Sequence, residues 1–129
     1  MPPTLTAIYA SLLALLFLAL SARVIFGRFR HRVSVGDGGD KDMLKRMRVQ
    51  ANCAEYAPIG ILMLGLAEMQ GMGPALLHLF GLMLLAGRTA HAYGFGRTPQ
   101  ISALRIGGMV LTVAMITLTA IGNLFLALA

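Results

Sequence analysis

Two uncharged stretches at the ends of the chain constrain its fold most strongly. Residues 1–22 contain no charged side chain, and residues 106–129 form an uncharged run of 24 residues. A helix rises about 1.5 Å per residue, so about 20 residues are needed to cross a hydrocarbon core of about 30 Å. Both stretches are therefore long enough to span a bilayer as helices.

The composition of the whole chain also indicates a membrane protein. Hydrophobic residues make up 57% of the 129 residues and charged residues only 12%, whereas about a quarter of the residues are charged in a typical soluble domain. Four spans and short loops use the whole length, which predicts a single domain over residues 1–129. The lone cysteine, Cys53, has no intrachain disulfide partner, and we expect it to be a buried apolar residue.

Turn signals divide the chain into four expected helices. Glycines mark the first connection at residues 36–39, and a Gly-Met-Gly-Pro turn ending at Pro74 marks the second. Asp40 is a suitable N-cap for the second helix, and Pro74 suits the first turn of the third. Short loops predict an antiparallel up-down bundle. The expected helices cover residues 4–26, 41–69, 74–93 and 102–128.

A cleavable signal peptide is the rival interpretation of the first stretch. It requires a basic segment ahead of the apolar run, and residues 1–4 contain no basic side chain. A retained first transmembrane helix is therefore favoured.

The basic residues orient the expected bundle in the membrane. All 11 Lys and Arg side chains surround the first and third connections, while the N-terminus, the second connection and the C-terminus have none. The positive-inside rule then places the first and third loops in the cytoplasm and both termini on the opposite side. Because these residues are interleaved with apolar spans, the net charge of +6 does not indicate nucleic-acid binding.

A polar stripe interrupts the second expected helix. Arg48, Asn52 and Glu55 are spaced i, i+4 and i+7, so they lie within about 60° of one another around the helix axis, with Tyr56 at the edge. Glu55 is expected ~9 Å inside the cytoplasmic boundary. Ionisable groups inside a membrane helix are costly and by default mark a functional site.

Polar groups on the other helices fall at a similar depth. The third helix offers Arg88, His91 and Tyr93, and the fourth begins near Arg105. Antiparallel packing should bring them to one layer with the stripe at the cytoplasmic end. A structural interpretation stays open, in which Glu55 and Arg88 form an ion pair that fixes helix register and Arg105 extends to the interface.

No metal site is expected. The three histidines lie at different depths, and no set of cysteine or carboxylate ligands completes a site around any of them. Asp37, Asp40 and Asp42 do not have the spacing of a calcium-binding loop and are interpreted as loop and cap residues. His78, near the opposite end of the bundle, is interpreted as a packing or interfacial histidine.

Two segments resemble motifs of one membrane protein family. The segment Arg48-Val-Gln-Ala-Asn-Cys-Ala-Glu-Tyr-Ala-Pro58 resembles the second-helix motif of the MAPEG family, the membrane-associated proteins in eicosanoid and glutathione metabolism. Gly87-Arg-Thr-Ala-His-Ala-Tyr-Gly94 is similar to its third-helix segment. The resemblance covers nearly the whole chain and is strongest to the short bacterial branch. It implies a homotrimer in the bacterial inner membrane, with glutathione bound at the subunit interface near the cytoplasmic face.

The resemblance also implies roles for individual residues. The positions that match glutathione-binding motifs are Arg48, Asn52, Glu55, Tyr56, Arg88 and His91. Arginine binds carboxylates through paired charge-assisted hydrogen bonds, and a glutamate can pair with the ammonium group of glutathione. Arg105 resembles the fourth-helix arginine that activates the thiol in some members, and Tyr93 is the other candidate for this catalytic role. Some animal members have tyrosines where this chain has His91 and Phe95, which weakens any assignment to eicosanoid synthesis.

These expectations support one leading function and two alternatives. The leading hypothesis is a glutathione-dependent membrane transferase or peroxidase that acts on lipophilic electrophiles arriving through the lipid. The first alternative is a non-catalytic membrane protein that retains the family fold. The second is a small proton-coupled multidrug exporter, which is disfavoured because its acidic residue is expected in the first helix and this chain has none there.

Overall fold

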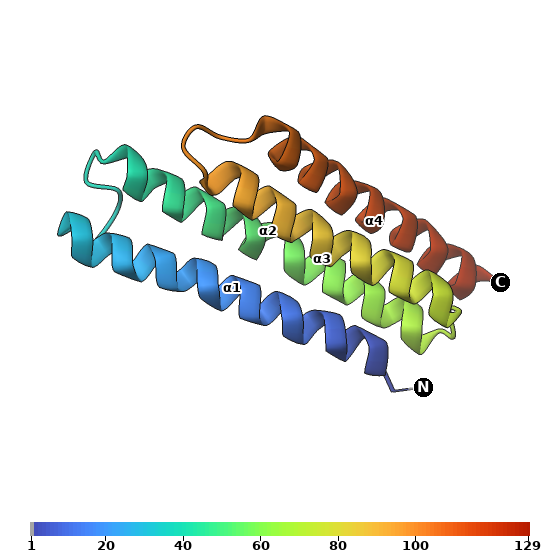
Figure 1. The fold of residues 1–129 in the computed structure, drawn as a ribbon. Coiled ribbons are helices and arrows are strands. Elements are labelled where there is room, and N and C mark those ends of the chain that lie inside the picture. Colours follow the sequence, from blue (N-terminus) through green and yellow to red (C-terminus); the bar gives the residue numbers. More distant parts are fainter. Residues whose placement is uncertain (1) are drawn as a thin grey trace.

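Four long helices form the whole fold. The structure is a computed structural model that describes residues 2–129, and it contains no strand in that part of the chain. Consecutive helices run in opposite directions, and both ends of the chain lie at the same end of the bundle (Figure 1). The predicted antiparallel four-helix bundle is confirmed. Its helices are α1 (Thr4–His31), α2 (Lys41–Met69), α3 (Pro74–Gly96) and α4 (Ser102–Leu128).

Two helices are longer than the sequence pattern predicts. The bounds of α2 and α4 match the expectation, but α1 continues to His31 instead of residue 26, and α3 continues to Gly96 instead of residue 93. Basic side chains in the last turn of α1 interact favourably with the helix dipole. The helix ends where Arg32 adopts a left-handed conformation and its N–H donates to the Arg28 carbonyl. The charged composition of residues 27–31 therefore continues the helix beyond the apolar span.

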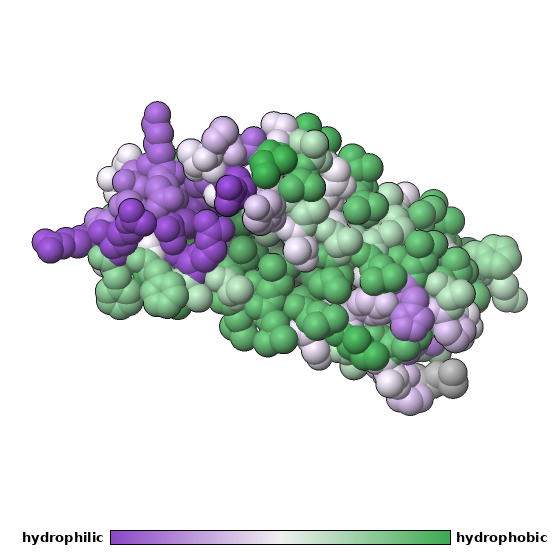
Figure 2. All heavy atoms as spheres, viewed as in Figure 1, coloured by the Kyte–Doolittle hydropathy of each residue, from purple (hydrophilic) through white to green (hydrophobic). Residues whose placement is uncertain are grey.

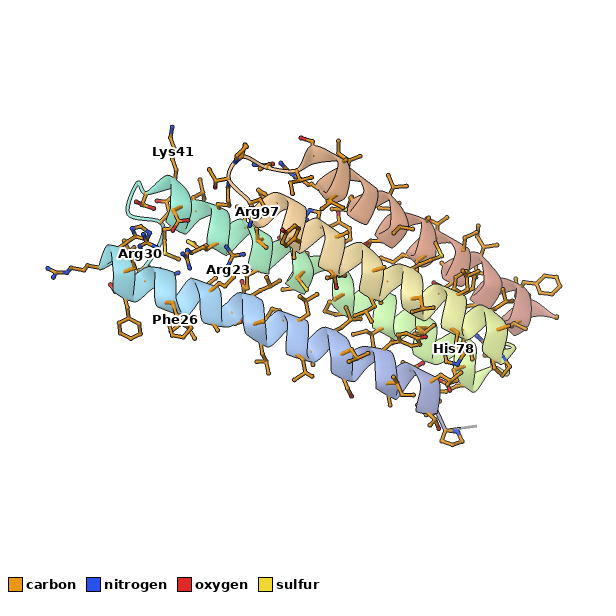
Figure 3. All side chains as sticks on the ribbon, in the orientation of Figure 1. Arg23, Phe26, Arg30, Lys41, His78 and Arg97 are labelled. Atoms are coloured by element: carbon orange, nitrogen blue, oxygen red, sulfur yellow. The ribbon has the colours of Figure 1, made fainter. Side chains whose placement is uncertain are left out.

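The surface of the bundle is divided along its length. Hydrophilic side chains gather around the first and third connections, and the rest of the visible surface is mainly apolar (Figure 2). We call the end that carries these two connections the basic end; His78 lies toward the other end (Figure 3). Three helices, α1, α3 and α4, are long and apolar enough to cross a membrane. The polar stripe makes α2 less apolar than the other three helices. However, α2 lies antiparallel to its neighbours in the same bundle and has a similar length. The protein is therefore a membrane-spanning helical bundle.

The interior consists of two apolar clusters. The larger one joins all four helices toward the ends of the chain and includes Tyr9, Leu64, Phe80 and Met115. The smaller one lies nearer the basic end and consists of Leu20, Val49, Cys53, Ala57 and Ala92. Cys53 is buried and unpaired, as predicted. Val49 and Ala92 follow Arg48 and His91 directly in the chain, so this cluster packs at the depth of the polar layer.

Glycines bring α3 and α4 into backbone contact beside this polar layer. A Cβ on Gly87 would lie 2.8 Å from the Gly108 carbonyl oxygen, and a Cβ on Gly94 would lie 2.7 Å from the Arg105 backbone nitrogen. Larger side chains at these positions would separate the helices. This close approach brings His91 of α3 and Arg105 of α4 to the same part of the α3–α4 contact.

A buried glutamate fixes the opposite end of the bundle. Glu68 is 6% exposed, and its two carboxylate oxygens accept hydrogen bonds from the backbone N–H groups of Leu5 (2.8 Å) and Thr6 (2.7 Å). The first N–H groups of a helix have no partner within the helix, so Glu68 of α2 acts as a cap for α1. Nearby, the Tyr9 hydroxyl lies 2.8 Å from Nδ1 of His78, consistent with a packing role for that histidine.

We expect Glu68→Ala to destabilise the protein by about 1–2 kcal/mol, because it leaves N–H groups of the first turn of α1 without acceptors. Glu68→Gln retains one acceptor oxygen and should lose less. Thermal unfolding of the purified protein in detergent measures both effects. A melting temperature of Glu68→Ala equal to that of the wild type would contradict the capping role.

Candidate functional site

A cleft at the basic end of the bundle brings together several of the predicted residues. It has a volume of about 460 Å³ and lies between α2, α3 and α4. We call it the α2–α4 cleft. The side chains that define its chemistry are Arg48, Asn52, His91, Phe95, Arg105 and Met109. Four of the predicted site residues, from three different helices, therefore share one concave surface, as the convergence of polar groups on one layer predicts.

Arg88 lies beneath this cleft and not in its lining. Its side chain is 1% exposed. Nε donates to the Thr112 hydroxyl at 2.9 Å, and Nη1 donates to the side-chain oxygen of Asn52. The guanidinium also lies 5.3 Å from the centre of the Tyr56 ring, a cation–π contact. Arg88 thus joins α2, α3 and α4 and fixes the orientation of Asn52.

The alternative interpretation, an ion pair between Glu55 and Arg88, does not match the structure among the described residues. Glu55 instead faces Arg48, with 3.7 Å between Oε1 and Nη1. At about 100° per residue, Asn52 lies about +40° from Arg48 around α2, whereas Glu55 lies about −20° from it. Arg88 approaches the side of α2 that carries Asn52 and Tyr56, so Glu55 is left on the outer side of the stripe.

The side chains of Arg48 and Glu55 are about half exposed in the single chain, at 51% and 54%. An exposed pair of this kind contributes little to stability in water. At the depth expected for Glu55, however, water is scarce, and an exposed charge facing hydrocarbon is costly. The geometry therefore presents a half-exposed charged patch on the outer side of α2.

Arg105 is held in place at the mouth of the cleft. Its guanidinium carbon lies 4.0 Å from the centre of the Phe95 ring, and Nη1 donates to the side-chain oxygen of Gln100 at 2.7 Å. His91, 3% exposed, meets the same Phe95 ring edge to face at 5.7 Å between ring centres. These contacts fix the position of the guanidinium, and among the described residues no carboxylate forms an ion pair with it. Its charge is therefore available to bind an anion.

Tyr93 faces a different part of the surface. It is 54% exposed and lines a separate cleft with Arg23, Arg97 and Thr98. The guanidinium carbon of Arg97 lies 5.5 Å from the centre of its ring. The structure therefore places Tyr93 and Arg105 in different clefts.

The acidic residues of the first loop take the structural roles expected for them. Asp40 accepts a hydrogen bond from the Met43 backbone N–H at 2.8 Å and caps α2. His31, Asp40 and Asp42 come close enough together to hold a cation. However, Asp42 also accepts a hydrogen bond from Nε of Arg46 at 2.9 Å. A positive charge in that position opposes metal binding.

Sequence reasoning missed the contribution of α4 below Arg105. Met109 lines the cleft, and Thr112 accepts the hydrogen bond from Arg88 while donating its own to the Gly108 carbonyl. Arg105, Met109 and Thr112 are spaced i, i+4 and i+7, the same spacing as the stripe on α2. That repeat was the available signal, but threonine and methionine are ordinary residues in a membrane helix.

Comparison with known proteins identifies the family of this chain. The MAPEG family matches residues 6–125. The chain belongs to the MAPEG family. It is also 37% identical over 120 residues to the inner membrane protein YecN of Escherichia coli K12. The aligned region covers 93% of this chain and 90% of the relative. The YecN protein of Escherichia coli O6:H1 (strain CFT073) gives the same values.

The two segments that resemble MAPEG motifs have a common location in the structure. The second-helix segment supplies Arg48 and Asn52 to the α2–α4 cleft, and the third-helix segment supplies His91 to it. The third-helix segment also supplies Arg88 beneath the cleft. This chain is thus a MAPEG membrane protein, of a family associated with glutathione and eicosanoid metabolism, whose motif residues converge at the basic end.

Proposed function

We propose that this MAPEG protein is a glutathione-dependent membrane transferase or peroxidase that acts on lipophilic electrophiles. The α2–α4 cleft carries the proposal, because Arg48 and Arg105 present two cations on one open surface beside Asn52 and His91. Glutathione offers two carboxylates, an ammonium group and a thiol. Forked guanidinium groups suit its carboxylates, and a cation beside the thiol favours the reactive thiolate.

Each predicted site residue, in the cleft or beside it, has a distinct proposed role. Arg48 binds a glutathione carboxylate, and Glu55 beside it binds the ammonium group. Arg88 holds the side-chain oxygen of Asn52, so the amide nitrogen of Asn52 is directed to donate to a peptide carbonyl of the ligand. In this proposal Arg88 acts through Asn52, while Tyr56 and His91 shape the site. Arg105 stabilises the thiolate, and Tyr93 is the secondary candidate for that role.

The exposed pair of Arg48 and Glu55 supports a homotrimer with glutathione at the subunit interface. Translocon-based scales put a charged side chain at the centre of a membrane helix at about 2.5–3.5 kcal/mol. A neighbouring copy and a bound zwitterion would together remove these charges from the lipid. By the positive-inside rule, the basic end faces the cytoplasm of the bacterial inner membrane, which is where reduced glutathione is available.

The proposed reaction is an attack by the glutathione sulfur on an electrophilic carbon. The thiol proton passes to solvent, a carbon–sulfur bond forms, and the bond to the leaving group breaks with its electron pair. An apolar electrophile can reach the cleft sideways through the bilayer, since α4 lines it with Met109 and other apolar residues. The protein supplies orientation and a stabilised thiolate.

Conjugation of glutathione to an aryl halide by the purified protein in detergent tests the proposal. We expect turnover, and we expect Glu55→Gln to raise KM for glutathione about tenfold by removing one charge-assisted contact. Glu68→Gln is the matched control, because it makes the same change at the opposite end of the bundle. Glutathione binding with neither conjugation of an aryl halide or an enone, nor reduction of a hydroperoxide to its alcohol with oxidation of two glutathione molecules to the disulfide, would instead identify a non-catalytic member of the family.

A further inference from the structure

A second cleft lies at the end of α1, away from the proposed glutathione site. It has a volume of about 480 Å³, and we call it the α1-loop cleft. Its lining combines two arginines and a serine with apolar side chains. These residues are Ile25, Arg28, Phe29, Arg32, Val33 and Ser34. None of them takes part in the proposed glutathione chemistry.

The depth of this cleft places it at the membrane surface. α1 begins at Thr4, and about 20 helical residues cross the hydrocarbon core. The helix therefore leaves the core near Ile25, and its last turns pass through the lipid headgroup layer. Phe26 and Arg30 extend outward from this end of α1 (Figure 3). Phe26 and Phe29 are 67% and 79% exposed, an arrangement that suits contact with lipid.

The charge of this cleft is not neutralised within the subunit. Among the described residues, no carboxylate lies within ion-pair distance of Arg28 or Arg32. The acidic residues of the same loop have other partners. Hydrogen bonds with His31 and Arg46 hold the pKa of Asp42 below its usual range, so it stays ionised in that cluster at neutral pH.

Arg28 is oriented by the loop that follows it. Its Nη1 donates to the Gly36 carbonyl at 2.9 Å and to the Val33 carbonyl at 3.4 Å. Both bonds use one nitrogen, so the other two nitrogens of the guanidinium keep their donors for another acceptor. A fixed guanidinium, a second arginine and a serine hydroxyl match the oxygens of a phosphodiester.

We propose that the α1-loop cleft binds the headgroup of an anionic phospholipid. The phosphodiester contacts Arg28 and Arg32, and the upper part of an acyl chain lies against Ile25 and Phe29. Basic side chains next to a membrane span attract anionic lipids, with about 1 kcal/mol per cation near the surface. The apolar walls select a lipid over a free phosphate ion. This site does not depend on the proposed glutathione activity.

Lipid binding to the purified, assembled protein in detergent tests the proposal. The probes are short-chain phosphatidylglycerol, phosphatidylcholine of the same chain length, and glycerol phosphate. We expect saturable binding of phosphatidylglycerol, with at least tenfold weaker binding of the other two. Arg28→Gln/Arg32→Gln should weaken phosphatidylglycerol binding about tenfold or more. Phe29→Ala keeps the charge and should weaken binding of the lipid without changing that of glycerol phosphate.

Arg30→Gln/Lys41→Gln is the matched control, because it removes two charges from the same end but outside the cleft lining. It should change the affinity less than threefold. Equal weakening by both double variants would show a diffuse charge effect and overturn the proposal, as would equal affinity for the two lipids. Dissociation of the oligomer by Arg28→Gln/Arg32→Gln, with no lipid bound by the wild type, would assign the cleft to a subunit contact instead.

Discussion

Gly108→Ala is expected to destabilise the protein by about 2–3 kcal/mol, although alanine is the better helix former. The added Cβ would meet the Gly87 carbonyl oxygen and lie 2.5 Å from the His91 backbone nitrogen. These are backbone atoms, so α3 and α4 must move apart, and overpacking of this kind typically costs about 1–3 kcal/mol. Thermal unfolding in detergent measures the effect.

The neighbouring glycine provides the control. A Cβ on Gly107 has no atom within 4 Å, so Gly107→Ala should be neutral or stabilising by up to about 1 kcal/mol through helix propensity. The two substitutions are chemically identical and one residue apart. If both variants unfold at the same temperature, the close approach of α3 and α4 at Gly108 is incorrect.

Gly108→Ala should also damage the site, because His91 and Arg105 are held together by the same approach of α3 and α4. We expect the conjugating activity of this variant to fall even under conditions in which the protein remains folded. Gly107→Ala should retain activity. A stable, fully active Gly108→Ala variant would separate the helix packing from the function of the cleft.

Arg105→Gln is expected to lower kcat/KM for glutathione conjugation about 10- to 100-fold. One charge-assisted interaction contributes about 1.5–3 kcal/mol, and each 1.4 kcal/mol corresponds to about tenfold in rate. Glutamine retains polarity and much of the length but lacks the charge that stabilises the thiolate. Steady-state kinetics with saturating electrophile measures the loss.

The pH dependence distinguishes thiol activation from a merely structural role. With Arg105 present, the thiolate forms below the ordinary thiol pKa of about 8.5, so the wild-type rate should level off at lower pH. The rate of Arg105→Gln should keep rising toward pH values above that pKa. Tyr93→Phe should change kcat/KM less than threefold, because Tyr93 lines the other cleft. A large loss in Tyr93→Phe with none in Arg105→Gln would reverse the assignment.

The fold could be predicted from the sequence because hydrophobic runs and glycine-rich turns punctuate the chain clearly. The bounds of α2 and α4 followed from Asp40, from the turn before Pro74, and from the last uncharged run. The end of α1 could not be predicted in this way. The hydropathy pattern marks only where the apolar span ends, but the helix continues beyond it because basic side chains in its last turn interact favourably with the helix dipole.

The site could be predicted only in part. The spacing of Arg48 and Asn52 on α2 placed them correctly on one surface with His91 and Arg105. The partner of Glu55 could not be predicted, because a rotation of tens of degrees between helices decides whether Asn52 or Glu55 meets Arg88. That rotation depends on how α2 packs against α3, for example where Gly60 meets Leu84, and the pattern of a single helix does not contain this information.

Calorimetric titration of glutathione into the purified protein in detergent tests the central claim most directly, namely that the α2–α4 cleft binds this zwitterionic thiol. Arg48→Gln and Arg97→Gln serve as the site variant and the charge-matched control, because Arg97 lies outside the cleft lining. We predict saturable binding that Arg48→Gln weakens about tenfold and Arg97→Gln leaves nearly unchanged. The absence of binding to the folded wild-type protein, or equal weakening by both substitutions, would contradict the account.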